Sequence, residues 1–443
     1  MSIWHIRHFA PSIIRSNKKI RYSLFEGTFL LAVLRRKCYN IHEQKFEVRR
    51  VKERVILHCD LDNFFASVEC VFEPKLKDVP MAVCGSESDR HGVVLAKNQL
   101  AKKYGIKTAE TVWQAKKKCP DLVTVPPHMD EYRKFSKRAV EIYLKYTDMV
   151  EQFSIDECWL DVTGSQLLFG TPEEIAQKIQ NDMKNQLGLT VSIGISFNKY
   201  FAKFASDVNK PDGYFSVYAD EFKEKMENRP IEELMGVGTT TRQKLQSMGI
   251  YKIGELYDAP QELLKRLLGK HGAELWKCVH GLDESPVRHY SEHQRPKSVG
   301  RSKTLHEDTR DIAQLKSILA CLCDDISASL RAEGLYASTV QIQLKDNLFK
   351  VSQYQKKLLK PTRIANELFC VGTELLCEDG RIKNPIRLIG ITAGALTDDN
   401  MGYQLSFTAD EQGDENKENL DSKVDCLRAK YGKSIIKRAS QIK

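Results

Sequence analysis

Apolar and polar positions alternate along the chain in a way that predicts strands and helices in turn from Val55 onward. β-prone apolar runs predict the strands, and apolar residues three and four apart predict the helices between them. The predicted strands are 81–84, 92–96, 122–125 and 190–196, and the predicted helices are 97–104, 112–119 and 129–146. This order predicts an α+β fold in which a split β-α-β layer carries an inserted small α/β lobe.

Two further helices belong to this layer. Thr171-Pro172-Glu173-Glu174 has the form of a capping box with proline at the first helical position, and predicts a helix that ends near Gly188. After strand 190–196 a helix carries Lys199 and Lys203 at i, i+4, so the two lysines share a face. Such a face can hold a triphosphate near a carboxylate site; the alternative is an ordinary solvated face.

Beyond Pro230 the pattern becomes helical. Gly236-Val237-Gly238 before Thr239 predicts a helix-hairpin-helix, because the glycine turn leaves backbone N–H groups free at the next helix start, where they can bind DNA phosphates. Gly236, Gly238 and Thr239 are therefore candidate DNA contacts. The alternative is an ordinary tight connection between two helices.

A polar stretch with Pro286 and Pro296 predicts a linker, and a compact β-α-β-β-α-β unit follows it over 298–396. Apolar and polar residues alternate over 339–345, so one face of its sheet is polar. Residues 291–363 hold 13 Lys and Arg against 8 Asp and Glu. This mildly basic surface could lie along a DNA duplex, with Arg301 and Lys345 as candidate contacts.

The net charge of +9 gives no information about the body of the chain. Residues 1–54 supply the whole excess, with 13 basic against 4 acidic side chains. Their apolar run 28–34 is too short to cross a bilayer and lacks a signal-peptide cleavage site. We expect a poorly ordered basic extension, or a start assigned upstream of the true one. The 12 cysteines lack zinc-ligand spacing and predict reduced thiols in a cytoplasmic protein without a membrane segment.

Candidate chemistry lies in two acid-bearing apolar runs. Asp156 and Glu157 interrupt the run 150–160, and Asp60 ends the strand-like run from Val55. Carboxylates are costly to bury unless a cation holds them, and oxygen ligands suit Mg²⁺. If the two strands pair, the three acids converge into a two-metal site for nucleotidyl transfer. Adjacent residues of a regular strand point to opposite faces, so this needs a turn or bulge at Asp156. The alternative is that both motifs occur by chance in a chain with 59 acids.

The order of these motifs over Val55 to Leu396 resembles the Y-family DNA polymerases. The resemblance is carried by residues 58–69, 154–157, 194–203, 210–213 and 236–238. It implies a right hand with a ferredoxin-like palm (55–63 and 130–220), small fingers (64–129), a helical thumb (221–290), a linker (291–297), a β-α-β-β-α-β little finger (298–400) and a tail (401–443).

The resemblance also implies roles for individual residues. It makes Asp60, Asp156 and Glu157, with the Leu61 carbonyl, the ligands of two Mg²⁺ ions, and it places Phe65 at the steric gate against ribonucleotides. It implies that dNTPs are bound by Phe64, Gln99, Lys102 and Lys203. Gln99 and Lys102 stand where the family usually has Tyr and Arg, and lysine lacks the bidentate fork of arginine. The steric-gate alternative is that Phe65 is a core aromatic beside Phe64.

By this resemblance the chain is a monomeric, low-fidelity, template-directed DNA polymerase of translesion synthesis and repair. A second enzyme hypothesis is another nucleotidyl transferase with a ferredoxin-like palm, such as a cyclase or primase. A hypothesis of another class is a catalytically silent DNA-binding scaffold.

The tail predicts a partner. Gln404, Leu405 and Phe407 resemble the short peptide by which these polymerases dock on the sliding clamp, in a truncated form. The alternative is that 403–407 is a last edge strand. The acidic segment 410–421 is expected to be disordered and the basic end 427–440 to favour a helix.

Overall fold

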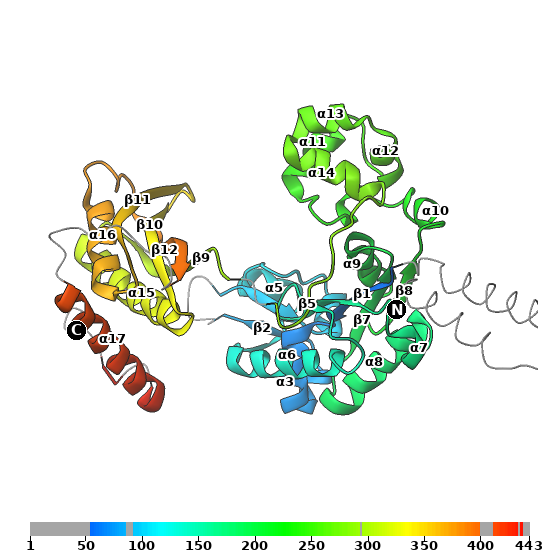
Figure 1. The fold of residues 1–443 in the computed structure, drawn as a ribbon, viewed down its shortest axis with the longest axis horizontal. Coiled ribbons are helices and arrows are strands. Elements are labelled where there is room, and N and C mark those ends of the chain that lie inside the picture. Colours follow the sequence, from blue (N-terminus) through cyan, green and yellow to red (C-terminus); the bar gives the residue numbers. More distant parts are fainter. Residues whose placement is uncertain (1–53, 86–91, 293–294, 399–410, 433–434, 437–443) are drawn as a thin grey trace, which may run out of the picture. The chain divides into compact units, whose positions relative to one another are not determined.

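The structure is a computed structural model that describes residues 54–85, 92–292, 295–398, 411–432 and 435–436 (Figure 1). The chain divides into two compact units. The first contains 1–59, 159–178 and 192–287, and the second contains 60–158, 179–191 and 288–443. The predicted extension, apart from Arg54, lies outside the described residues.

A five-stranded sheet has the strand order β5-β6-β1-β7-β8. Its strands are β1 (Ile56–Leu61), β5 (Val150–Gln152), β6 (Glu157–Asp161), β7 (Val191–Ser196) and β8 (Tyr214–Val217). Four of them follow the connectivity β1-α6-β5-β6-α8-β7, with α6 at Met129–Tyr143 and α8 at Pro172–Leu187. A β-α-β-β-α-β chain with β1 between β7 and β6 has the ferredoxin-like order that the resemblance implied. β8 extends the sheet parallel to β7.

The capping box forms as the sequence predicts. Thr171 N–H donates to Glu174 Oε2 at 2.8 Å, and Glu174 N–H donates to Thr171 Oγ1 at 3.2 Å. Both bonds satisfy backbone donors that the first turn of α8 leaves without a helical partner. Between α6 and α8, the short helix α7 spans Gln166–Phe169.

An inserted lobe follows β1. It contains α3 (Phe64–Phe72), the 3₁₀ turn η2 (Pro74–Lys77), α4 (Gln99–Lys103) and α5 (Val112–Lys118), with a three-stranded sheet of order β3-β2-β4. The strands are β2 (Met81–Cys84), β3 (Val94–Lys97) and β4 (Val123–Val125). The sequence predicted β2, β3, β4, α4 and α5, and these five are confirmed with ends shifted by two residues or fewer, because frayed ends depend on caps that periodicity does not reveal. It did not predict α3 or η2.

The first unit contains the helix after β7 and a helical domain. α9 (Lys199–Val208) packs directly on β7, since a Cβ at Gly194 would lie 2.0 Å from the Ala202 carbonyl oxygen. The following elements are α10 (Phe222–Met226), η3 (Ile231–Glu233), α11 (Thr239–Gln246), α12 (Ile253–Asp258), α13 (Gln261–Leu268) and α14 (Lys270–Val279). One apolar core joins α9 to these helices, with Leu245, Leu256 and Leu264 fully buried.

The predicted β-α-β-β-α-β unit is confirmed. Its sheet has the order β11-β10-β12-β9 and α15 and α16 cover it (Figure 1). The elements are β9 (Ser298–Thr309), α15 (Ile312–Ala332), β10 (Leu335–Asp346), β11 (Val351–Thr362), α16 (Ala365–Cys377) and β12 (Ile386–Asp398). Val340, Ile342 and Leu344 point into the core, as the alternation predicts.

The expected disorder of 410–421 is wrong from Glu411 onward, because α17 spans Glu411–Tyr431 and packs on α15. Arg331 on α15 is paired with Asp421 at 3.2 Å and with Asp425 at 2.6 Å. Arg363 pairs with Glu418 of the same helix. The acidic composition of this segment predicted disorder. Its acids are paired with arginines that are distant in sequence, and composition does not show such pairs.

No helix among the described residues is long and apolar enough to cross a membrane. The cysteines in this part of the chain are free thiols, as their spacing predicts.

Candidate functional site

The end of β1 and the turn between β5 and β6 lie side by side. Leu61 N–H donates to the Asp156 carbonyl oxygen at 3.1 Å. Asp156 is in the turn and Glu157 is the first residue of β6, so the turn that the sequence argument required is present. Phe153 N–H closes this turn on the Glu157 carbonyl at 2.9 Å. The pairing of strands therefore places Asp60, Asp156 and Glu157 in one region.

The side chains of this region provide hard oxygen ligands. Asp60 is 6% exposed, and Ser154 Oγ donates to Asp156 Oδ1 at 2.6 Å. Burial raises the pKa of the Cys158 thiol, and the neighbouring Asp156 and Glu157 raise it further, so Cys158 stays a neutral thiol behind the acids. Carboxylates with a backbone carbonyl form the donor set that Mg²⁺ prefers.

Within the described ranges, no three His, Cys, Asp or Glu side chains stand in an arrangement that could hold a metal ion. Like-charged carboxylates repel one another, and a divalent cation would favour their approach. The fold brings the backbone positions of the three acids together, and their oxygen atoms are of the type that Mg²⁺ prefers.

Phe64 and Phe65 have different surroundings. Phe64 is 3% exposed and belongs to the buried face of α3, whereas Phe65 is partly exposed. The Phe65 ring stacks on Tyr132 of α6, with the centroids 4.3 Å apart and an angle of 11° between the planes. Of the two rings, only Phe65 is partly open to solvent.

Sequence reasoning missed the support of Phe65. Tyr132 OH donates to the buried carboxylate of Glu69, and His128 Nδ1 lies 2.9 Å from the same Glu69 oxygen. Burial raises the pKa of Tyr132, and the Glu69 carboxylate raises it further, so the hydroxyl keeps its proton as the donor. The available signal was a glutamate inside the apolar helix 64–72, which required a buried partner.

Gln99 and Lys102 lie on α4, which Asn98 holds in place. The Asn98 amide accepts from Ala101 N–H at 2.9 Å, as an N-cap, and donates to the carbonyls of Leu76 at 3.0 Å and Val79 at 2.7 Å. Gln99 is partly exposed and Lys102 is exposed. Burial, and then Lys102, lowers the pKa of Lys97, as expected where cations crowd.

The two lysines of α9 have different environments in the first unit. Lys199 is 9% exposed and its Nζ lies 5.0 Å from the centroid of the Trp159 ring. The Lys203 side chain is 15% exposed, and its Nζ lies 3.6 Å from Asp207 Oδ2. The predicted common face is therefore mostly covered, and Lys203 remains the candidate triphosphate contact.

The glycine turn of the helical domain has the predicted form. Gly236 has a φ of +89°, a conformation that favours glycine, and Gly238 is the N-cap of α11, which begins at Thr239. His271 Nε2 lies 3.0 Å from the Gly236 carbonyl oxygen and holds the turn. The first N–H groups of α11 thus form a helix N-terminus of the kind that binds phosphate.

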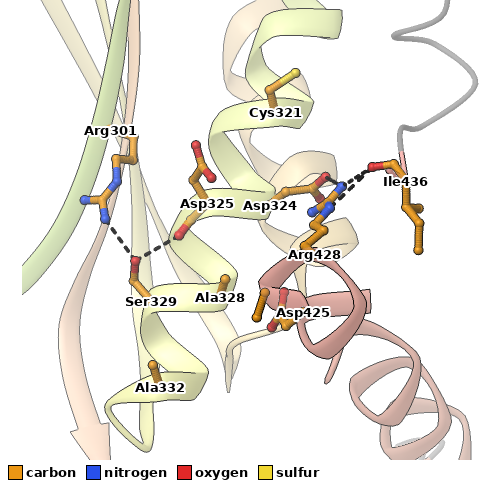
Figure 2. Close-up of a pocket in the computed structure, with 11 residues that line it drawn as sticks. Arg301, Cys321, Asp324, Asp325, Ala328, Ser329, Ala332, Asp425, Arg428 and Ile436 are labelled. Carbon is orange, nitrogen blue, oxygen red and sulfur yellow. Dashed lines mark hydrogen bonds and ion pairs between the residues drawn. The ribbon is translucent and has the colours of Figure 1, made fainter. Parts of the chain in front are cut away.

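Arg301 and Lys345 lie on opposite faces of the four-stranded sheet. Arg301 pairs across the sheet with the core residue Ile391, whereas Lys345 lies next to the core residue Leu344 and points away from it. Arg301 Nη2 donates to Ser329 Oγ at 2.9 Å, on the side covered by α15 (Figure 2). Of the two candidate DNA contacts, Lys345 is therefore the one on the open face of the sheet.

Arg301 borders a cavity of about 690 Å³ between α15 and α17. Figure 2 shows Arg428 of α17 reaching Asp324 of α15, with an ion-pair distance of 3.2 Å. Asp324 is 9% exposed, so its charge is neutralised within the protein. α17 therefore covers part of α15 on the helical side of this unit.

Comparison with known proteins gives a consistent result. Residues 59–207 match the impB/mucB/samB family, 296–407 match the C-terminal domain of that family, and 232–283 match the DNA polymerase-iota thumb domain. The chain is 42% identical over 386 residues to DNA polymerase IV of Acetivibrio thermocellus, covering 87% of this chain and 97% of that protein. It is 40% identical to DNA polymerase IV of Alkaliphilus oremlandii, with 88% and 99% covered.

A solved structure agrees with these relatives. The Y-family DNA polymerase chimera of Dbh and Dpo4 superposes with a TM-score of 0.71 at 26% identity, covering 78% of this chain and 99% of that chain. The chain belongs to the Y-family DNA polymerases. It is a DNA-directed DNA polymerase of the translesion class that binds primer–template DNA, and divalent-metal dependence is general in this family. Gln404, Leu405 and Phe407 of this polymerase lie outside the described residues.

Proposed function

We propose that this Y-family polymerase extends a DNA primer with dNTPs by two-metal nucleotidyl transfer, with low fidelity, in translesion synthesis and DNA repair. The observation that carries the proposal is the hydrogen bond from Leu61 to Asp156, which sets the β1 acid beside the β5–β6 turn. The domain boundaries inferred from the sequence remain part of the proposal.

Asp60, Asp156 and Glu157, with the Leu61 carbonyl, would hold two Mg²⁺ ions. Bound there, the ions would lower the pKa of the primer 3′-hydroxyl and screen the triphosphate charge. Ser154 fixes the orientation of Asp156 through its 2.6 Å hydrogen bond. The role of the protein is then mainly to hold oxygen ligands in position.

Nucleotide selection would involve the inserted lobe. Phe65, fixed against Tyr132, would occupy the space of a 2′-hydroxyl, with Phe64 packed behind it. Gln99 and Lys102 of α4 and Lys203 of α9 would contact the triphosphate. A lobe of one small sheet and three helices gives limited enclosure of the nascent pair, so discrimination would rest mainly on base pairing.

DNA would be held through its phosphates. The Gly236–Gly238 turn and Thr239 at the start of α11 offer backbone donors, and Lys345 lies on the open sheet face. Phosphate contacts of this kind bind without reading sequence, as a polymerase requires. We further propose that the protein works as a monomer, with a sliding clamp bound by Gln404, Leu405 and Phe407.

Primer extension tests the active site. Asp156→Ala should lower extension with Mg²⁺ by about a thousand-fold, because a metal ligand contributes several kcal/mol of charge stabilisation. Primer–template affinity should change little, because the proposed phosphate contacts are elsewhere. Asp130→Ala removes a carboxylate that is 88% exposed on α6 and is the matched control.

Substantial synthesis by Asp156→Ala would refute the assignment of the metal site. A wild-type protein that binds primer–template but never extends it would be a silent scaffold. Cyclic product from nucleotide alone would indicate a cyclase, and synthesis without a primer would indicate a primase.

A further inference from the structure

The surface of the inserted lobe between β3 and the end of α5 is strongly basic. Residues 97–118 contain seven lysines and one acid, Glu110. Lys118 Nζ pairs with Glu110 at 2.5 Å and also donates to the Gly105 carbonyl at 2.8 Å. The other six lysines of this segment are Lys97, Lys102, Lys103, Lys107, Lys116 and Lys117. This concentration of positive charge favours a polyanion.

An exposed tryptophan lies within this basic surface. Trp113 is 65% exposed on α5, and Lys117 Nζ lies 4.1 Å from the centroid of its ring, one turn along the helix. In contrast, Trp159 and Trp276 are buried or partly buried, and their indole N–H groups donate to backbone carbonyls. A large ring exposed among lysines combines a stacking surface with phosphate-binding charge.

We propose that this face of the fingers binds the unpaired template strand, with a base stacked on Trp113 and a phosphate at Lys117. Stacking needs a base with an open face, which single-stranded DNA offers and a duplex does not. The positive charge disfavours an apolar or basic protein partner. The inference rests on the proposed function, because a template-directed polymerase holds unpaired template ahead of the primer end.

Equilibrium binding to two primer–templates tests the inference. One substrate has a long unpaired 5′ template extension and the other has only the templating nucleotide unpaired. Trp113→Ala should weaken binding of the long-extension substrate by about 5- to 100-fold, the range of one lost base stack, and leave the short-extension substrate unchanged. Lys117→Ala should reduce the slope of log affinity against log salt by about 0.7 on the long substrate only.

Trp113→Phe keeps an aromatic ring and should retain most of the affinity. An unlabelled thymidine oligonucleotide should quench the tryptophan fluorescence of the wild-type protein, and Trp113→Phe should remove that quenching. The matched control is Tyr431→Ala on α17, where Lys430 Nζ lies 5.0 Å from a ring that is 58% exposed. α17 has six acids against four basic residues, so loss of the Tyr431 ring should not affect DNA binding.

If Trp113→Ala lost the same affinity for both substrates, with its circular dichroism unchanged, the inference would be overturned. Trp113 would then belong to duplex or protein contacts. Unchanged affinity on both would also overturn it. Primer extension on the short-extension substrate at saturating DNA separates the two proposals. Trp113→Ala should still extend this primer. If the wild-type protein does not extend it, the polymerase mechanism alone is refuted.

Discussion

At the scale of single residues, Ser154 gives a test of how the metal ligands are positioned. Its hydroxyl donates to Asp156 at 2.6 Å, and such orienting partners typically contribute 10- to 100-fold in metal affinity or activity. Ser154→Ala should therefore lower extension by about 10- to 100-fold at limiting Mg²⁺, and excess Mg²⁺ should restore part of it. A Mg²⁺ titration of extension rate checks this. Ser165→Ala, next to α7, should behave as wild type.

The adjacent phenylalanines give a second test at this scale. Phe65→Ala should raise ribonucleotide incorporation by about 10- to 100-fold, because the ring stacked on Tyr132 no longer excludes a 2′-hydroxyl. Phe64→Ala should instead destabilise the fold by about 3–5 kcal/mol, because Phe64 is 3% exposed. Ribonucleotide incorporation and urea denaturation measure the two effects. The same gain in incorporation from both variants would contradict the choice of Phe65.

At the scale of elements, the contact of α9 with β7 depends on one glycine. A Cβ at Gly194 would lie 2.0 Å from the Ala202 carbonyl oxygen and 2.4 Å from Ser206 N, both on α9. Gly194→Ala must push the helix off the strand, so it should lower the free energy of unfolding by about 3 kcal/mol and also weaken dNTP binding through Lys203. Thermal unfolding and dNTP titration check both effects.

Gly164→Ala is the control for this element, because a Cβ there meets nothing within 4 Å. A stable Gly194→Ala variant with normal dNTP affinity would show that the position of α9 is not critical for the site.

At the scale of the whole molecule, the clamp hypothesis needs substitutions and not a deletion. α17 follows the candidate peptide and is tied to α15 through Arg331, so removing 403–443 would also remove a packed helix. Changing Gln404, Leu405 and Phe407 together to Ala should leave distributive extension unchanged and abolish stimulation by added clamp, which acts by effective concentration. Processivity assays with and without clamp measure this.

Leu420→Ala removes an exposed leucine from α17 and should leave stimulation intact. If stimulation survives the triple substitution, the clamp anchor lies elsewhere in the chain.

The sequence by itself determined what depends on near neighbours. Periodicity located most helices and strands, the capping box at Thr171 formed as predicted, and the acids of two apolar runs indicated the chemistry. A family resemblance added the arrangement of these parts and the hypothesis that Phe65 is the steric gate. All of these features depend on residues a few positions apart or on motif order.

Tertiary structure decided what depends on distant partners. Phe64 and Phe65 are identical in type and adjacent, and only the fold distinguishes Phe64, which is 3% exposed, from Phe65, which is partly exposed and stacks on Tyr132. Arg301 faces the helices because β9 pairs with β12 in one register. α17 packs on α15, and Arg331 and Arg363, far away in sequence, pair with its acids. Charge and burial at these positions result from residues brought together by folding, which local pattern does not encode.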